Sequence, residues 1–289
     1  MNEPGASRPD LLVQSRAALL DALLALEAHR DSVIVIGAQA VYLRTAAAPV
    51  ALAEATKDSD LAVDPRELGE DPRLEDAMTR AGFHPNPDSR QPGAWLSSTG
   101  IPVDLMVPAS LTAGGKQTRG GRIPPHSKSA TRRADGLEAA LIDNSPVEVA
   151  ALDPADIRRY TVKVAGCAAL LVAKLHKIGE RVGDPNPTRL QDKDAHDIYR
   201  ILIDTETTEL AGTFVQLRAD ELSGAATETA ISYLQQLFAA GPNALGAQMA
   251  GRAESGIGDP DLVAASVSAL AEDLSEALQT AQEHNGGRR

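Results

Sequence analysis

The amino-acid sequence predicts an α+β protein, in which a mixed sheet with flanking helices is followed by a mostly α-helical C-terminal domain. The chain has 289 residues, which is more than a single domain usually contains. Short extended runs alternate with helical patterns in the first 160 residues, as in a sheet covered by helices. Beyond that point, helical periodicity continues almost to the end. We therefore expect one domain over residues 1–160 and a helical domain over 161–289.

Hydrophobic spacing predicts the elements of the first domain in order. Apolar residues at helical spacing predict a leading helix over 10–30, and "DSVIVIG" predicts a buried strand that ends at Gly37. The helix "AQAVYLRTAAA" follows, then the strand "SDLAVD" and a helix over 70–82. The runs "AWLSS", "IPVDLMVP" and "PVEVAAL" predict further strands, the last of them at an edge of the sheet.

Two helices open the second domain, and both carry charges beside an apolar stripe. Lys174 borders the stripe of "GCAALLVAKLHKIGERV", and Asp194 and Asp197 share a face with isoleucines in "DKDAHDIYRILID". Carboxylates on an apolar face need partners. We expect Asp197 to pair with Lys174 or Arg181, either as a structural ion bridge or as part of a functional site.

Composition narrows the class of protein. Hydrophobic residues make up 43% of a chain with a net charge of −12, which favours a soluble globular protein. Aromatic residues make up only 3%, which argues against aromatic platforms for single-stranded nucleic acid. The single cysteine excludes an internal disulfide, and no run approaches 18 apolar residues. "MNEPGASRPD" lacks a secretory pattern, so we expect a cytoplasmic protein that does not bind membranes.

The stretch "EATKDSDLAVDP" places Asp58 and Asp60 one residue apart in an otherwise buried strand. Side chains two residues apart lie on the same face of a strand, so these carboxylates would repel each other. They need a cation, hydrogen-bond donors or water between them. Mg²⁺ fits this need, because one or two carboxylates hold it while substrate phosphates complete its coordination. The alternative is a wet strand end where the pair is only solvated.

Two further features supply the remaining groups that a metal-assisted nucleotidyl transfer needs. Asp104, in "IPVDLMVP", adds a third carboxylate on another strand. Gly37 joins a strand to the N-terminus of a helix, whose N–H groups can bind phosphate oxygens. In this chemistry two carboxylates hold a metal on the nucleotide phosphates, and a third helps to bind a second ion that lowers the pKa of the attacking hydroxyl.

A basic segment lies within this acidic protein. No acidic residue occurs from Leu105 to Ala134. The segment carries Lys116, Arg119, Arg122, Lys128, Arg132 and Arg133. Its charge predicts contact with phosphate or RNA. The alternative is a solvated loop, since "TAGGKQTRGGRIPPHS" is rich in Gly and Pro.

In this order, "VIVIGAQAVYL", "TKDSDLAVD" and "VDLMV" resemble the nucleotidyltransferase superfamily. The second half is similar to its AbiEii-type toxin branch, with a lysine in "LLVAKLHKIGER" followed by "RLQDKDAHDIYR". The resemblance spans residues 33–203. It implies an enzyme that uses Mg²⁺ or Mn²⁺ to move a nucleotide from a nucleoside triphosphate to an acceptor, which is tRNA in some members. It also implies an antitoxin protein as partner.

The resemblance and the charge pattern together define the expected site residues. The expected catalytic residues are Asp58, Asp60, Asp104, Lys174 and Asp197, of which Asp58, Asp60 and Asp104 are the metal ligands. The expected nucleotide-binding residues are Gly37, Ala38, Gln39, Lys57, Arg119, Arg122, Arg181, Lys193 and Asp194. Ala38 departs from the family, which usually has Gly or Ser there. Phosphate binding must then rest on backbone N–H groups, Gln39 or Lys57.

Two other functions fit the same residues. One is a small-molecule nucleotidyltransferase of the antibiotic-modifying type. An acidic acceptor site would favour an aminocyclitol as acceptor, whereas a basic site lined by residues 116–133 would favour RNA. The other is a catalytically inactive fold that serves as a binding module, which Ala38 supports. The joint presence of Asp58, Asp60, Asp104 and Lys174 argues against the inactive fold, because a decayed site has no physical reason to keep repelling carboxylates.

Overall fold

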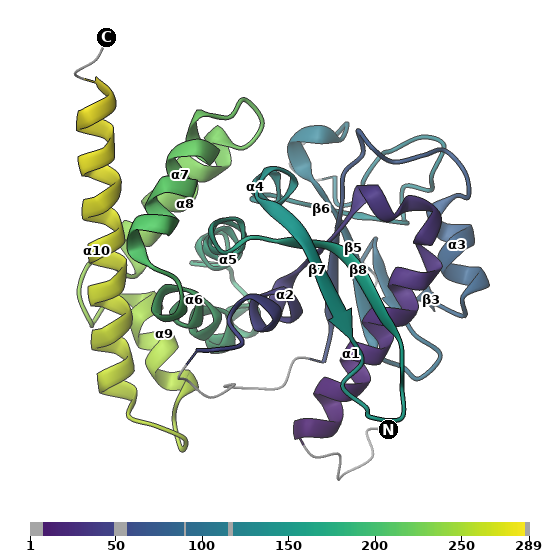
Figure 1. Ribbon diagram of the computed structural model, residues 1–289, viewed down its shortest axis with the longest axis horizontal. Helices are drawn as coiled ribbons and strands as arrows, with labels where there is room; N and C mark the ends of the chain where they lie inside the picture. Colours follow the sequence, from purple (N-terminus) through teal and green to yellow (C-terminus); the bar gives the residue numbers. More distant parts are fainter. Residues whose placement is uncertain (1–7, 49–56, 90, 115–117, 287–289) are drawn as a thin grey trace. The chain divides into compact units, whose positions relative to one another are not determined.

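The computed structural model of the protein describes residues 8–48, 57–89, 91–114 and 118–286. The chain forms two compact units, and each is described by itself. Unit 1 comprises Met1–Ala40, Ala55–Leu137 and Asn144–Ala165, and unit 2 comprises Val41–Glu54, Glu138–Asp143 and Gly166–Arg289. Figure 1 labels their helices and strands.

Unit 1 combines strands with a few helices, as the sequence predicts. Its strands are β1 (Val33–Ile36), β2 (Ser59–Val63), β3 (His84–Pro85), β4 (Ala94–Leu96), β5 (Pro102–Pro108), β6 (Arg132–Ala134), β7 (Asn144–Ala150) and β8 (Arg159–Ala165). Its helices are α1 (Arg8–Ala25), α3 (Leu74–Arg80) and the 3-10 turns η1 (Glu27–Ser32) and η2 (Ala109–Leu111). Helix α2 (Gly37–Arg44) begins in unit 1 and ends in unit 2.

Within the described residues, the strands of unit 1 form one sheet in the order β3-β4-β5-β2-β1-β8-β7, and β6 also pairs with β5. Strand β1 is antiparallel to β2 and parallel to β8, while β2 is parallel to β5. The sheet is therefore mixed, which confirms the predicted α+β class. Strand β7 lies at the edge, as "PVEVAAL" predicts.

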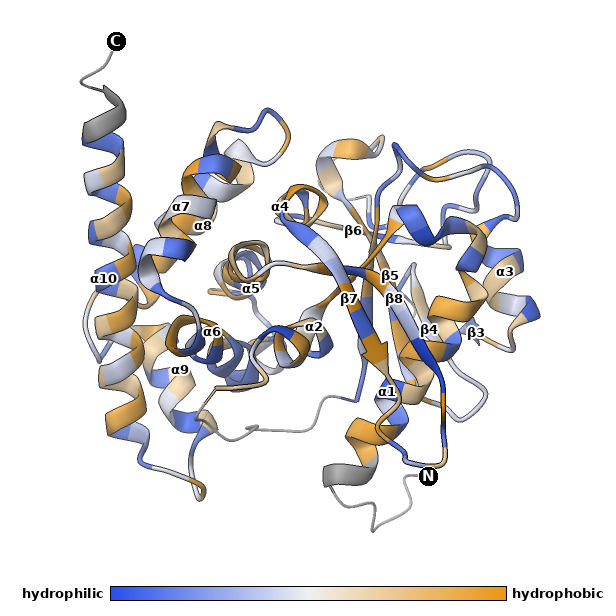
Figure 2. Ribbon diagram, in the orientation of Figure 1, coloured by the Kyte–Doolittle hydropathy of each residue, from blue (hydrophilic) through white to orange (hydrophobic). Residues whose placement is uncertain are grey.

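The central strands form the core of unit 1. All four residues of β1 are buried, and Figure 2 shows hydrophobic residues along the strands of the sheet. Helix α1 packs on one face, where the Ser59 hydroxyl of β2 donates a hydrogen bond to the Ser15 carbonyl at 3.0 Å. Because side chains alternate along a strand, the neighbours of Ser59 point to the opposite face.

Strand β8 lies partly where the sequence predicts the helical domain. Val162 and Val164 are buried, whereas Thr161 and Lys163 between and beside them are more exposed. This period-two alternation is typical of a strand with one buried face. The helices of the second half therefore begin at Cys167, and a boundary at residue 160 falls inside β8.

The described residues of unit 2 form helices and the loops that join them. Its helices are α4 (Glu138–Ile142), α5 (Cys167–Gly179), α6 (Asp192–Asp204), α7 (Thr207–Ala219), α8 (Gly224–Leu237), α9 (Leu245–Ala253) and α10 (Pro260–Gly286), with the 3-10 turn η3 (Pro187–Arg189). Helix α5 packs against α4, α6 and α8. The predicted helical C-terminal region is confirmed. No helix among the described residues combines the length and hydrophobicity that crossing a bilayer would require.

His126 fixes the start of α3 in unit 1. Its Nδ1 accepts a hydrogen bond from the Leu74 N–H at 3.1 Å, so the ring proton must lie on Nε2, which donates to the Gly69 carbonyl at 3.0 Å. The bond from Leu74 needs the neutral ring, because a protonated Nδ1 cannot accept a hydrogen bond. Burial lowers the pKa of His126 below its ordinary value of 6.5, which agrees with this requirement.

We expect acid to weaken this contact. An unfolded histidine binds protons more tightly than His126 does in the fold, so stability is complete above about pH 6.5 and falls below it, by at most about 1.4 kcal/mol per pH unit. His29, Glu75 and Arg73 are the charged or titratable groups that act on His126. Urea unfolding at pH 7.5 and 5.5 tests this. His126→Asn, which keeps an acceptor but does not titrate there, should lose less stability on acidification than the wild type; an equal loss would contradict the assignment.

Candidate functional site

Asp60 is the second residue of β2, on the face of the sheet opposite α1, and Asp58 directly precedes the strand. Ser59 between them is fully buried and bonded to α1, so side-chain alternation turns both carboxylates the other way. Both are half-buried. The structure thus places Asp60 on the face predicted for the D-x-D pair, with Asp58 at the entry to the same strand.

Asp60 lies directly over the glycine turn that starts α2. In the sheet register it faces Ile36, the last residue of β1. Gly37 follows with a φ of +69°, and a Cβ built on it would lie 2.1 Å from Asp60 Oδ2. Gly37 is therefore required twice, because L-residues disfavour this backbone conformation and because the Asp60 carboxylate fills the place of a side chain. A carboxylate and a helix N-terminus consequently meet at one point.

Gly37→Ala should destabilise unit 1 by about 1–3 kcal/mol, because the new Cβ meets both backbone strain and the Asp60 carboxylate. Gly82→Ala is the matched control. Gly82 has a φ of +86°, and no atom lies within 4 Å of the place that a Cβ would take there, so this change tests backbone strain alone. Chemical denaturation should show a larger loss for Gly37→Ala. Equal losses would mean that Asp60 does not crowd the turn.

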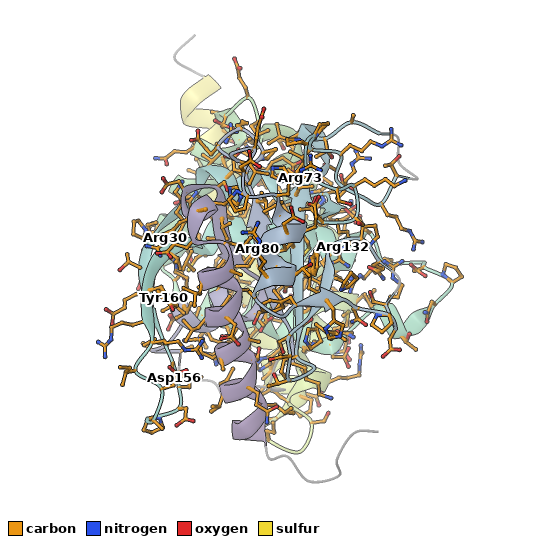
Figure 3. The ribbon with its side chains drawn as sticks, turned by 90° about the vertical axis from the view of Figure 1, so that its right-hand side faces the viewer. Arg30, Arg73, Arg80, Arg132, Asp156 and Tyr160 are labelled. Carbon is orange, nitrogen blue, oxygen red and sulfur yellow. The ribbon has the colours of Figure 1, made fainter. Side chains whose placement is uncertain are left out.

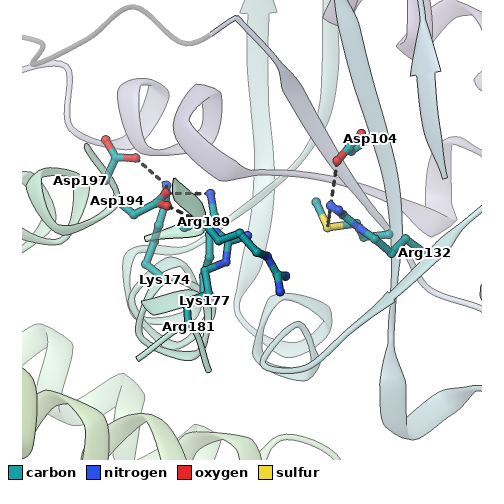
Figure 4. A network of polar contacts seen from close by, with 9 residues as sticks. Asp104, Arg132, Lys174, Lys177, Arg181, Arg189, Asp194 and Asp197 are labelled. Carbon is teal, nitrogen blue, oxygen red and sulfur yellow. Dashed lines mark hydrogen bonds and ion pairs between the residues drawn. The ribbon is translucent and has the colours of Figure 1, made fainter. Parts of the chain in front are cut away.

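The third carboxylate, Asp104, lies beside Asp60 and has a cationic partner. Strands β2 and β5 are parallel with Asp60 opposite Asp104, so the two side chains lie on the same face. Asp104 Oδ2 accepts a hydrogen bond from Arg132 Nη2 at 2.7 Å, as Figure 4 shows. Arg132 also donates to Gln91 Oε1 at 2.7 Å. The basic segment therefore reaches the sheet through Arg132.

The residues are suited to a metal ion that binds together with a nucleotide. They are less suited to a metal ion that is held by protein ligands alone. Across the described part of the chain, no three carboxylates, imidazoles or thiols group closely enough to hold an ion. Asp60 and its neighbour Asp58 nevertheless offer two half-buried carboxylates on one face. Two carboxylates suffice for Mg²⁺ when phosphates supply further ligands. The pair fits that donor set, and the guanidinium on Asp104 makes that third carboxylate a poorer ligand.

Gln39 is one of the residues predicted to bind phosphate in place of a serine at position 38, but in the structure it has another role. Its side chain is 1% exposed. Gln39 Oε1 accepts from Arg16 Nε at 2.9 Å, and Nε2 donates to Ser15 Oγ at 2.9 Å. Gln39 therefore joins α2 to α1. Ala38 is half-buried in the first turn of α2 and Lys57 is exposed next to Asp58. Of the predicted phosphate contacts at this turn, the backbone N–H groups and Lys57 remain.

The basic segment divides into two groups. Arg119, Arg122 and Lys128 are exposed. Arg133 instead donates to the Ala109 carbonyl at 2.9 Å, and Arg132 belongs to the site of Asp104. Lys116 lies outside the described residues.

Unit 2 holds a buried ion cluster formed by α5 and α6. Lys174 Nζ donates to Asp194 Oδ1 at 2.8 Å and to Asp197 Oδ2 at 2.6 Å, as Figure 4 shows. All three residues are at most 5% exposed. Lys177 Nζ also donates to Asp194 Oδ1, at 2.8 Å. The structure thus brings together the lysine and the two aspartates that the sequence singles out.

The charges of this cluster stabilise one another. Burial alone would lower the pKa of Lys174, but the carboxylates of Asp194 and Asp197 outweigh it and raise that pKa. Burial alone would raise the pKa of Asp194, but Lys174 and Lys177 lower it. Arg181 lies 3.8 Å from Asp194 Oδ2 and donates to the Arg189 carbonyl. Lys193 is half-buried on α6.

Sequence reasoning missed two partners in these clusters. The sequence predicts Arg132 in a loop that contacts an anion, and only its pairing in β6 places it beside Asp104. Lys177 follows Lys174 by three residues, which is the helical spacing for two side chains on one face. That spacing could have predicted a shared carboxylate.

Comparisons of the chain with known proteins do not identify its family. No family model matches the chain, and no curated protein matches it. Solved structures that it resembles include a candidate nucleotidyltransferase from H. pylori, with a TM-score of 0.33 and 12% identity over 95% of this chain and 98% of that one. Another is JHP933 from Helicobacter pylori, with a TM-score of 0.31 and 12% identity over 99% and 100% of the two chains. Such low TM-scores do not identify a function, which depends on the residues of the site.

Proposed function

We propose that the protein is a nucleotidyltransferase that moves a nucleotide from a nucleoside triphosphate to a hydroxyl of an acceptor. The observation that carries this proposal is the meeting of Asp60 with the Gly37 turn at the start of α2. A helix N-terminus attracts phosphate, while a carboxylate beside it repels phosphate unless a cation lies between them. A metal–nucleotide complex satisfies both groups at once.

The roles of the residues follow from their chemistry. The first N–H groups of α2 would bind phosphate oxygens, and Lys57 would add a positive charge. Asp58 and Asp60 would hold Mg²⁺ or Mn²⁺, which when bound neutralises phosphate charge and orients the α-phosphate. The oxygen of the acceptor hydroxyl would form a bond to the α-phosphorus and give its proton to solvent water. The bond between the α-phosphorus and the oxygen that bridges to the β-phosphate would break, and pyrophosphate would leave. The half-buried carboxylates keep the charged groups in place for this in-line displacement.

The direct test offers each nucleoside triphosphate, labelled at the α-phosphate, with MgCl₂ and two kinds of acceptor. One reaction contains total RNA with its tRNA, and the other contains an aminocyclitol antibiotic. We expect label to enter one acceptor class, to need the metal, and to disappear with Asp60→Asn. Label in RNA supports the tRNA-type acceptor, and label in the antibiotic supports the small-molecule enzyme. Tight nucleotide binding without transfer would instead favour a binding module.

Between the two acceptor classes, the exposed Arg119 and Arg122 favour RNA. If they contact phosphates, the affinity for RNA should fall steeply as the salt concentration rises. The double variant Arg119→Ala/Arg122→Ala should make the slope of log K against log[salt] shallower by about 1.4, because each lost contact on a single strand changes the slope by about 0.7. Fluorescence anisotropy measures the affinity for tRNA at salt concentrations from about 50 to about 200 mM, over which phosphate contacts weaken. Arg73→Ala/Arg80→Ala, which removes two exposed arginines of the α3 region, is the control. Equal slopes for all variants would reject the role.

The resemblance to the toxin branch leads to one physiological proposal. Transfer of nucleotides to tRNA would block its use, so expression of the protein alone would arrest growth, and a partner antitoxin would relieve the arrest. The order of Lys174, Lys193, Asp194 and Asp197 in the chain supports this branch. Growth arrest by the wild type but not by Asp60→Asn would agree with it. Growth arrest by both would show a cause other than transfer.

A further inference from the structure

We propose that Arg132 takes the place of a second divalent cation, so that the site binds one Mg²⁺ or Mn²⁺ per nucleotide, held by Asp58 and Asp60. The inference rests on the proposed function. It departs from the prediction that all three carboxylates bind metal, and it gives Asp104 a different role. Asp104 would be a positioning residue that holds Arg132 beside the nucleotide.

The first support is the set of contacts that hold the Arg132 guanidinium. Nη2 donates to Asp104 Oδ2 at 2.7 Å, and Nη1 donates to Gln91 Oε1 at 2.7 Å. Nη2 also lies 3.2 Å from Met106 Sδ. The side chains of Arg132 and Asp104 are only 26% and 20% exposed. Two side chains of β5 and one from the segment before β4 therefore contact one guanidinium, which is more than a solvated surface ion pair usually has.

The second support is that the backbone places Arg132 where it is. Strand β6 is parallel to β5 with Met106 opposite Arg132, so Arg132 lies on the same face as Asp104, two residues before Met106. Gly93 allows this approach. A Cβ on Gly93 would lie 2.3 Å from the Leu105 carbonyl oxygen and 2.5 Å from the Arg132 nitrogen. Its φ of +73° also favours glycine.

The third support is electrostatic. A guanidinium stays charged at any pH that a folded protein tolerates, and it can only donate hydrogen bonds. A divalent ion on Asp104 would therefore have to displace this donor or lie next to a fixed positive charge. Because Asp60 faces Asp104 across β2 and β5, the guanidinium already supplies positive charge on the face that carries the metal-binding pair. A single metal ion and this guanidinium would then share the neutralisation of the triphosphate.

Counting bound metal ions tests this inference without measuring transfer. Mn²⁺ is titrated into the full-length protein with one equivalent of a nucleoside triphosphate analogue whose α,β-bridge is methylene, and free Mn²⁺ is followed by electron paramagnetic resonance. We expect one ion per wild-type chain, bound more tightly than by the analogue alone. Asp104→Asn should keep one ion with an affinity within about twofold, since it is not a ligand, whereas Asp60→Asn should lower the affinity at least about tenfold.

Removal of the guanidinium should release the second site. Arg132→Gln should bind two ions, and the double variant Arg132→Gln/Asp104→Asn should return to one. Arg80→Gln is the control, because it removes an exposed arginine of the same unit and should keep one ion; Figure 3 labels both arginines. Far-UV circular dichroism checks that each variant is folded. The wild type and Asp104→Asn decide the question even if Arg132→Gln fails to fold.

Two results would overturn the inference alone: two Mn²⁺ ions on the wild-type chain, or a tenfold loss of affinity in Asp104→Asn. In either case Asp104 binds metal. A different result would overturn the proposed function as well, namely Mn²⁺ binding in the mixture no tighter than binding to the analogue alone. The number of ions and the affinity therefore separate the two failures.

Discussion

Replacing Asp60 by Asn is expected to lower nucleotide transfer at least about 10³-fold, which is about 4 kcal/mol of transition-state stabilisation. The carboxylate lies over the Gly37 turn, where the metal and the phosphates would meet. Asn has the same shape but lacks the negative charge, so it fills the same space and binds a divalent cation poorly. The effect should appear mainly in kcat/KM, measured with labelled nucleotide and whichever acceptor takes up the label.

The control for this change is Asp76→Asn, which removes an exposed carboxylate of α3 in the same unit. It changes the net charge equally and should leave transfer within about twofold, because exposed charges at a distance are screened. Thermal unfolding without metal should show that Asp60→Asn remains folded. Near wild-type transfer by Asp60→Asn would remove Asp60 from the site and with it the proposed chemistry.

The second large effect is expected on stability in unit 2. Lys174→Met should lower the free energy of unfolding by about 3–5 kcal/mol, because it leaves two buried carboxylates without their main cation. Lys174 is 5% exposed, and Asp194 and Asp197 are 1% and 5% exposed. A methionine fills much the same volume, so the loss would report charge rather than packing. Urea unfolding followed by circular dichroism measures it.

Lys177→Met provides a closely matched control. Lys177 contacts the same Asp194 oxygen at the same 2.8 Å as Lys174, but its side chain is 34% exposed. Solvent can replace its charge, so its removal should cost less than about 1 kcal/mol. Similar losses for the two variants would contradict the view that burial makes Lys174 the central cation of the cluster.

The same variants address the predicted catalytic role of Lys174 and Asp197. A role in transfer requires that Lys174→Met lowers kcat/KM under conditions where the variant is still folded. Asp197→Asn keeps the shape of the side chain and should then lower transfer with a smaller loss of stability. If transfer by both folded variants equals that of the wild type, the cluster only joins α5 to α6, and the support that Lys174 gives to the toxin branch is lost.

Local patterns in the sequence are sufficient for most of the fold. Strand β1 is a short run of buried β-branched residues between a helix and a glycine turn, and β2 follows with an aspartate pair whose parity fixes its face. Strand β8 also carries a signal, because Val162 and Val164 alternate with polar residues. The predicted start of the helical domain at residue 161 is wrong, because it falls inside β8. The helical pattern follows β8 directly, and the prediction assigns the end of the strand to it.

The parts that could not be predicted depend on contacts between residues distant in the chain. Gln39 is adjacent to the turn that the sequence predicts to bind phosphate, but Ser15 and Arg16 of α1 bind its amide. Arg132 follows a long segment rich in Gly and Pro, and a three-residue strand carries no periodicity that places it beside Asp104. In both cases the residue type is compatible with phosphate binding, and only the tertiary partner decides its role.

The most direct measurement of the central claim is the affinity of the wild-type protein for a nucleoside triphosphate with and without a divalent metal. Isothermal titration with each of the four ribonucleotides, in Mg²⁺ or in excess EDTA, needs no knowledge of the acceptor. If Asp58 and Asp60 hold a metal on the phosphates at the Gly37 turn, Mg²⁺ should tighten the binding of at least one nucleotide about tenfold or more, and Asp60→Asn should abolish this gain. Nucleotide affinity that is unchanged by Mg²⁺ in the wild type, or an equal gain in Asp60→Asn, would contradict the account.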